Sequence, residues 1–271
     1  MTLSILDAVS LPLIFVLGVV LQIVFIEVGY RYGTFRRGQP KPNKSQMAQV
    51  RAIMGASLGL LAFMLAFTFN TAQNHHEQRA FAYMEEVSAI DTAYRASDLI
   101  LASERQAAKD LLIDFTKLRL ETSRAVDDGD LSATLQRIRE SEEIHDQLWT
   151  LAEISMEGEG DHEDTGLFAN AILAMISAHD ARLQAAFFNR ISTVIWMSLF
   201  VMALLSMIVM GYQAGLTGTR SKLATWAIAL TFSLVMVLIT DLDRPNTTLF
   251  EINQELMVAL EQRMETQGAT R

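Results

Sequence analysis

Two aspartates interrupt the apolar stripe of a long helix that the sequence predicts beyond its second apolar segment. Asp91 and Asp98 lie seven residues apart, which places both side chains on one helical face. A carboxylate on a buried face needs a counter-charge. We therefore expect structural ion pairs between these aspartates and Arg182 or Arg190, on the last helix of the same region.

Other acidic residues raise the question of a metal site. Glu85 and Glu86 lie beside the aspartate stripe and offer the oxygen ligands of a hard cation such as Ca²⁺. Glu142 and His145 form an E-x-x-H motif, but a di-metal carboxylate site needs two such motifs and two further glutamates. We expect no cofactor apart from that Ca²⁺ alternative. Without a nucleophile elbow or a phosphate loop, we also expect no enzyme and no catalytic residue. The enzymatic alternative is a metal-dependent site in the bundle that would use the carboxylates and His145.

Small residues follow one face of the second apolar segment, and polar residues continue that face beyond it. One interpretation is a pore wall with a polar mouth, in which the neighbouring Phe63, Phe67 and Phe69 form a hydrophobic constriction. The other is close helix packing of the G-x-x-x-G kind, with the phenylalanines facing lipid. The pore-lining candidates are Gly55, Gly59, Ala62, Phe63, Ala66, Phe67, Asn70 and Gln73.

Charged residues also lie at the ends of other apolar segments. Glu27 would be costly in hydrocarbon, so we expect it to pair with Arg31, Arg51 or Arg220. Asp241, Asp243 and Arg244 either ring a pore mouth or lock the tail to the helical bundle expected over residues 71–190. The vestibule or gating candidates are Glu77, Glu85, Glu86, Asp91, Asp98, Asp241, Asp243 and Arg244.

All these candidates depend on four apolar segments that are long enough to cross a bilayer. Of the 271 residues, 51% are hydrophobic, and a helix of about 20 apolar residues spans a hydrocarbon core of roughly 30 Å. We predict an all-α membrane protein with two transmembrane hairpins, at 1–70 and 191–241. The spans cover residues 11–27, 52–70, 191–210 and 223–240.

The distribution of charge predicts the orientation. The connector 31–51, which contains Pro40 and Pro42, carries six basic residues and no acidic one, whereas residues 71–190 carry 23 acidic and 11 basic residues. Because basic loops stay in the cytoplasm, we expect 71–190 and both termini to be extracytoplasmic. The net charge of −9 disfavours nucleic-acid partners, and the absence of cysteine excludes thiolate sites and disulfides.

Residues 71–190 read as an acidic extracytoplasmic helical bundle. The segment lacks proline, and we expect breaks at 127–130, at 157–161 and near Ser103, where Ser103 and Gln106 could form a capping box. The expected helices are 71–101, 104–126, 131–156 and 166–190. A segment that leaves and re-enters one side of a membrane closes simply as an up-down-up-down bundle, followed by a partly helical tail at 242–271.

The two hairpins share a short motif. Gly29-Tyr30-x-x-Gly33 follows the first span, and Gly211-Tyr212-x-x-Gly215 follows the third. Since both hairpins enter from one side, the match suggests either a parallel repeat or a chance similarity.

Several of these stretches together resemble the bacterial bestrophin-like membrane proteins, and the resemblance covers most of the chain from Ala52 onward. Where that family often has a proline after its Asp-Leu pair, this chain has Ile100. The resemblance implies kinship with anion channels. The segments that carry it are Leu61–Phe69, Glu85–Leu99, Arg190–Ile191, Trp196, Gly211–Leu216, Arg220 and Asp241–Pro245.

The features together predict a homo-oligomeric ion channel of a bacterial cytoplasmic (inner) membrane, with inorganic ions and the lipid bilayer as partners. The second span would line the pore. An acidic vestibule concentrates cations, so we expect cations to be favoured over anions. The alternative is a non-conducting receptor or scaffold whose outer bundle binds a ligand or a partner protein.

Overall fold

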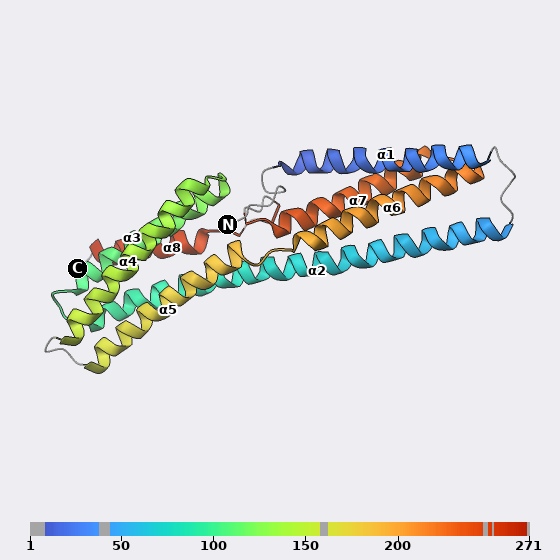
Figure 1. Ribbon diagram of the computed structural model, residues 1–271. Coiled ribbons are helices and arrows are strands. Elements are labelled where there is room, and N and C mark those ends of the chain that lie inside the picture. Colours follow the sequence, from blue (N-terminus) through green and yellow to red (C-terminus); the bar gives the residue numbers. More distant parts are fainter. Residues whose placement is uncertain (1–8, 38–43, 158–161, 246–248, 251, 270–271) are drawn as a thin grey trace. The chain divides into compact units, whose positions relative to one another are not determined.

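The computed structural model describes residues 9–37, 44–157, 162–245, 249–250 and 252–269, and all regular structure within them is helical (Figure 1). The chain forms two compact units, which we call unit 1 (residues 1–75 and 190–244) and unit 2 (residues 76–189 and 245–271). The helices are α1 (Leu11–Arg37), α2 (Lys44–Ala96), the short 3₁₀ helix η1 (Ser97–Leu99), α3 (Arg105–Asp127), α4 (Leu131–Glu157), α5 (His162–Phe187), α6 (Thr193–Thr217), α7 (Lys222–Asp243) and α8 (Glu255–Ala269).

Four helices are long and apolar enough to cross a membrane: α1, α2, α6 and α7. All four extend past the predicted spans, because a helix can continue with polar side chains once it has left hydrocarbon. α1 runs to Arg37 and α2 begins at Lys44, so the prediction of a connector over 31–51 is wrong at both ends. Pro40 and Pro42 lie outside the described residues. α6 likewise continues past residue 210 to Thr217.

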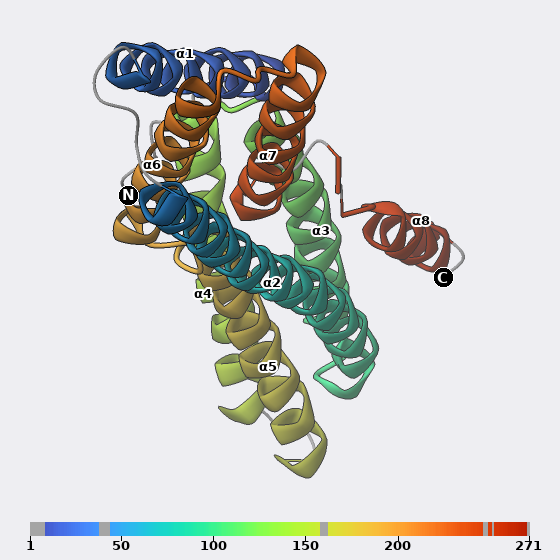
Figure 2. The ribbon, with the colours of Figure 1, turned by 90° about the vertical axis from the view of Figure 1, so that its right-hand side faces the viewer.

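In unit 1 the two G-Y-x-x-G motifs pack directly on one another. A Cβ atom added to Gly29 would lie 2.1 Å from the carbonyl oxygen of Ile208, and one added to Gly211 would lie 2.0 Å from that of Ile26. Gly33 and Gly215 make the same reciprocal approach one turn further along. α1 and α6 are therefore parallel here, with backbones so close that only glycine fits. Figure 2 shows α6 and α7 both against α1.

A second contact in unit 1 joins α2 to α6 and α7. Leu61 and Leu65 of α2 are buried with Leu199 of α6 and Ile239 of α7. Unit 1 is thus held by close backbone packing on one side of α6 and by interlocking larger side chains in this second cluster.

Unit 2 has a core formed by the second part of α2 together with α3, α4, α5 and α8. The tail, which the sequence places after the membrane segments, contributes Met257, Leu260 and Met264 to this core. The hydroxyl of Tyr94 donates to the carbonyl of Met264 at 3.0 Å. The unit therefore contains α8 in addition to the four helices expected over 71–190.

The break expected near Ser103 is present, but its predicted cause is wrong. α2 ends at Ala96, η1 follows, and α3 begins at Arg105 with no side-chain cap from Glu104. Gln106 donates to Asp110 instead of closing a capping box with Ser103. The predicted start of the last helix at 166 is also wrong, because α5 begins at His162. The loop expected at 157–161 lies outside the described residues from 158 onward.

The glycine contact in unit 1 makes a clear prediction. Gly211→Ala places a methyl group against the Ile26 carbonyl, so the helices must separate, and we expect a loss of about 1–3 kcal/mol of stability. Gly55→Ala is the matched control, because an added Cβ there meets no described atom within 4 Å. Thermal unfolding of the detergent-purified protein, followed by circular dichroism, measures both. Equal melting temperatures for the two variants would refute the packing argument.

Candidate functional site

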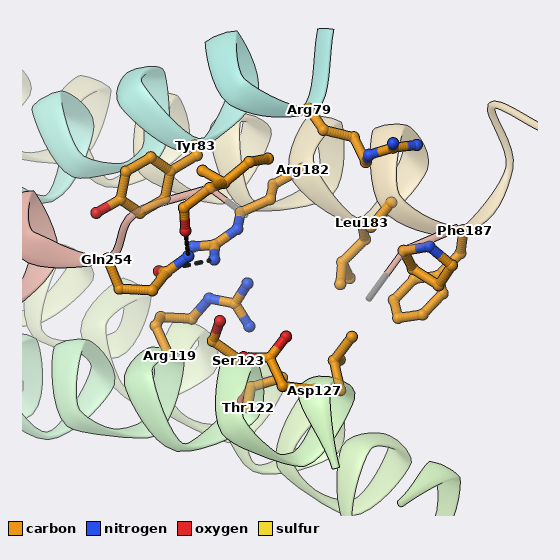
Figure 3. A pocket seen from close by; sticks show the side chains of 14 residues that line it. Arg79, Tyr83, Arg119, Thr122, Ser123, Asp127, Arg182, Leu183, Phe187 and Gln254 are labelled. Carbon is orange, nitrogen blue, oxygen red and sulfur yellow. Dashed lines mark hydrogen bonds between the residues drawn. The ribbon is translucent and has the colours of Figure 1, made fainter. Parts of the chain in front are cut away.

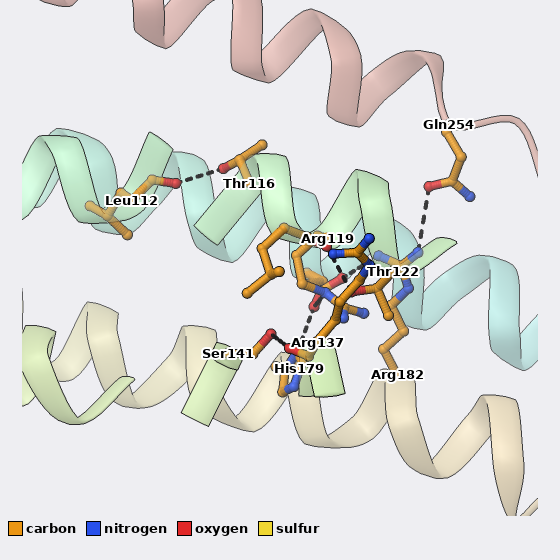
Figure 4. A network of polar contacts seen from close by, with 11 residues as sticks. Leu112, Thr116, Arg119, Thr122, Arg137, Ser141, His179, Arg182 and Gln254 are labelled. Atoms are coloured by element: carbon orange, nitrogen blue, oxygen red, sulfur yellow. Dashed lines mark hydrogen bonds and ion pairs between the residues drawn. The ribbon is translucent and has the colours of Figure 1, made fainter. Parts of the chain in front are cut away.

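The most deeply buried charged side chain described in unit 2 is that of Glu86, which has no exposed surface. Arg119 donates from Nε to its Oε1 at 2.8 Å, and Nδ1 of His179 lies 3.0 Å from the same oxygen. Arg182 donates from Nη1 to the other oxygen. We call these four side chains the Glu86 network (Figure 4). It joins α2, α3 and α5 at one point.

The arginines of this network are fixed by further contacts. The guanidinium of Arg182 lies over the ring of Tyr83, 5.0 Å from the ring centre, and donates from Nη2 to Gln254 at 3.4 Å. The Tyr83 hydroxyl accepts from the backbone of Met257 at 3.0 Å. Burial lowers the pKa of Arg119, although attraction to Glu86 opposes this shift. Two guanidiniums at one carboxylate strongly favour its ionised form.

A histidine pair lies next to the network. The rings of His145 and His179 are 5.0 Å apart, and Phe115 contacts both. Burial, with repulsion from His179 and Arg119, lowers the pKa of His145 from 6.5 to about 4. His145 is therefore neutral at physiological pH.

The expected partners of the aspartate stripe are wrong. Arg182 binds Glu86, and Arg190 lies 3.5 Å from Asp243 in unit 1. Asp91 instead pairs with Arg95, and with Arg263 of α8 at 2.7 Å, and Asp98 pairs with Lys109 at 2.5 Å. Arg182 pairs with Glu86, the more deeply buried carboxylate, because an unpaired charge costs more free energy where it is more deeply buried.

The two glutamates proposed for Ca²⁺ lie in different environments. Glu85 is exposed, and both oxygens of Glu86 are taken by basic side chains. A Ca²⁺ ion at Glu86 would be repelled by the two guanidiniums that already contact this carboxylate, so Glu86 is poorly placed to bind Ca²⁺. Among the described residues, no group of three or more histidine, aspartate or glutamate side chains is arranged to hold a metal ion.

The pore-lining candidates on α2 form one uncovered face of the chain. We call it the small-residue face: Gly55, Gly59, Ala62, Ala66, Asn70 and Gln73, all of which are exposed. The flanking Phe63 and Phe67 are 66% and 56% exposed. Within the described chain, no atom lies within 4 Å of a Cβ added to Gly55 or Gly59. The close packing considered for these glycines is found instead at the G-Y-x-x-G motifs of α1 and α6.

The charged residues at the ends of the spans are engaged within unit 1. Glu27 pairs with Arg31 at 3.0 Å and with Arg220 at 2.8 Å, two of the three partners expected for it. Asp243 accepts from the backbone of Ile191 at 2.8 Å, and Arg244 donates to the carbonyl of Val9 at 2.5 Å. Asp241 is also buried, whereas Glu77, which belongs to unit 2, is exposed. The 241–244 segment therefore fastens the end of α7 to other parts of unit 1.

Sequence reasoning missed two members of the Glu86 network, Arg119 and His179. A signal for Arg119 was present, since it lies on the apolar face of α3 with Leu112 and Phe115. It also missed Gln22, which donates to Ser233 across α1 and α7 at 2.9 Å. Arg119 and Gln22 each interrupt a periodic apolar face, and such an interruption indicates a buried polar contact.

The Glu86 network predicts a large difference between neighbouring glutamates. Glu86→Gln leaves two buried guanidiniums without their counter-charge, and we expect a loss of about 3–5 kcal/mol. Glu85→Gln changes an exposed side chain, so we expect an effect within roughly 0.5 kcal/mol. Thermal unfolding of both variants in detergent measures the difference. The network has no structural role if the Glu86 variant melts with the wild type.

His145 predicts a pH dependence of stability. The unfolded chain takes up a proton at this residue as pH falls below 6.5, whereas the folded chain resists protonation until about pH 4. The contribution of His145 is therefore complete above pH 6.5 and is lost as pH falls toward 4. We expect His145→Gln to make the melting temperature depend less on pH across this range. His162→Gln, at an exposed position, should leave the pH dependence of the melting temperature unchanged. An unchanged profile in the His145 variant would contradict the assignment.

Comparison with known proteins identifies the family. The bestrophin-like domain matches residues 21–255, which include α2 to α7 and most of α1. No curated protein matches the chain. The family match confirms the resemblance carried by the segments around Phe69, Asp98 and Asp243, and it agrees with the four apolar helices. The chain is therefore a multi-pass membrane protein that belongs to the bestrophin-like family, a channel-like family of membrane proteins.

Proposed function

We propose that the protein is an oligomeric ion channel of a bacterial cytoplasmic membrane in which α2 lines the pore. The observation that carries this proposal is the small-residue face, which is uncovered along the apolar part of α2. Within the described chain, no atom lies within 4 Å of a Cβ added to Gly55 or Gly59, and Ala62 and Ala66 are exposed. In a ring of subunits, the same face would surround an axis and leave room for ions.

The sizes and polarities of the side chains along this face support conduction. Gly55, Gly59, Ala62 and Ala66 would leave a wide lumen, and the neighbouring Phe63 and Phe67 would provide a constriction that gates by excluding water. Asn70 and Gln73 would form a polar entrance. The bestrophin-like family match supports the same interpretation.

We propose the orientation and the selectivity from charge. The basic ends of the α1–α2 connection would stay in the cytoplasm, so unit 2 and both termini would be extracytoplasmic. In this orientation, both hairpins of unit 1 would enter the bilayer from the extracytoplasmic side. The acidic surface of unit 2 would raise the local cation concentration, so we propose that cations are slightly favoured over anions.

The second candidate function is a receptor or scaffold that does not conduct. Its support is the unbroken course of α2 from residue 44 to residue 96, which could carry a displacement caused by a ligand or partner of unit 2. The charged cavity beside the Glu86 network offers such a ligand a place to bind.

Flux through liposomes distinguishes the two functions. Reconstituted wild-type protein is expected to carry K⁺, Na⁺ or Cl⁻, and Ala62→Phe is expected to reduce the flux at least several-fold by narrowing the lumen. Ala227→Phe, on an exposed face of α7, is the matched control and should leave the flux unchanged. Absence of flux under every voltage, pH and Ca²⁺ condition would remove the channel proposal.

A further inference from the structure

Unit 2 contains a cavity of about 90 Å³ beside the Glu86 network (Figure 3). At roughly 10–15 Å³ of such volume for one water, it has room for several waters and therefore for a small ion. All of its lining residues belong to unit 2. We call it the arginine cavity, and its polar lining includes Arg79, Tyr83, Arg119, Ser123, Arg182 and Gln254.

Positive charge exceeds negative charge around the arginine cavity. Arg79, Arg119 and Arg182 line it, and Asp127 is the one carboxylate among the lining residues that the structure describes. Glu86 supplies a second carboxylate, since it contacts both Arg119 and Arg182. Arg119 and Arg182 therefore share one buried carboxylate, and Asp127 is exposed to solvent, where its charge is screened. Among the described residues, this pair of guanidiniums has one positive charge more than its buried counter-charge.

Arg119 has a buried donor that the network does not use. Its side chain is only 3% exposed, and its Nε is engaged by Glu86. Its Nη1 is also buried, and it has no hydrogen-bond partner among the described residues. Figure 3 shows the guanidinium among the side chains that line the cavity, near Arg182. Buried donors in folded proteins are nearly always paired, so this nitrogen indicates a missing acceptor.

We propose that the arginine cavity binds a small oxyanion, either a carboxylate or a phosphate-like group. Such an ion supplies both missing features, the counter-charge and an acceptor for Nη1 of Arg119. Its paired oxygens match the fork of a guanidinium, which a single-atom ion such as chloride does not. The hydroxyl of Ser123 lies in the same lining and offers a further polar contact. The binding site lies wholly in unit 2 and does not depend on whether the protein conducts ions.

The test uses full-length protein in detergent at constant ionic strength. Sodium acetate, succinate, phosphate and sulfate are titrated in turn against a sodium chloride background, and the melting temperature is recorded. We expect at least one oxyanion to raise it saturably, by roughly 5 °C near a hundredfold excess over Kd. A response to acetate or succinate identifies a carboxylate ligand, and one to phosphate or sulfate identifies a tetrahedral ligand.

Two variants tie the effect to the cavity. Ser123→Leu fills the space without removing a charge, and we expect the oxyanion response to fall at least tenfold in apparent affinity. Ser88→Leu, at an exposed position on α2, is the matched control and should respond as the wild type does. If Ser123→Leu does not fold, Ser123→Val is the milder substitution, and isothermal titration of the wild type measures binding directly.

The proposal is overturned by either of two results. One is a wild-type protein that responds to no oxyanion beyond the chloride baseline, by melting or by titration. The other is a saturable response that persists unchanged in a folded Ser123 variant, which would place the ion elsewhere. Liposome flux is measured separately, so a protein without flux that still binds an oxyanion refutes only the channel.

Discussion

A single ionised carboxylate inside unit 2 constrains the arrangement of the helices around it. Glu86 on α2 is buried, and it is stabilised by Arg119 from α3 together with His179 and Arg182 from α5. Removing a charge from water costs several kcal/mol, which is recovered only when the partners meet it with good geometry. The three helices must therefore keep this register, and Tyr83 and Gln254 hold Arg182 in place from the other side. One carboxylate cannot neutralise two guanidiniums, which is why positive charge remains at the neighbouring cavity.

Unit 1 is organised by a different constraint, the close approach of two backbones. Gly29 and Gly33 of α1 face Gly211 and Gly215 of α6 in a reciprocal contact that leaves no space for a Cβ atom. In a membrane, the hydrophobic effect does not bring helices together, so close packing of this kind supplies much of the association. The reciprocity also gives the repeated G-Y-x-x-G motif a physical reason, because each copy is the surface on which the other packs. α6 and α7 both pack on α1, and the apolar part of α2 packs on α6 and α7.

The proposed pore rests on the residues of α2 that are exposed in the single chain. Its larger apolar residues, such as Leu61 and Leu65, are buried against α6 and α7. Its small residues are exposed, they lack the bulk of a typical lipid-facing surface, and an added Cβ at Gly55 or Gly59 meets no described atom within 4 Å. A pore lining made by several subunits satisfies both features. The same helix continues into unit 2, where it carries Glu86, so the proposed pore wall and the charged network belong to one continuous element.

The sequence by itself determined the helical class, the four helices long and apolar enough to cross a membrane, and the family, and it predicted a break near Ser103 from a capping box that does not form. These follow from local quantities: the length of apolar runs, the positions of glycine and proline, and short motifs. Only the tertiary structure decided which glycines pack closely, since Gly55 and Gly211 look alike in sequence and differ in having a neighbour. It also decided that Arg182 binds Glu86 and not the aspartate stripe, and that α8 joins unit 2. Ion-pair partners are chosen by burial and distance, and neither is set by the residues on one helix alone.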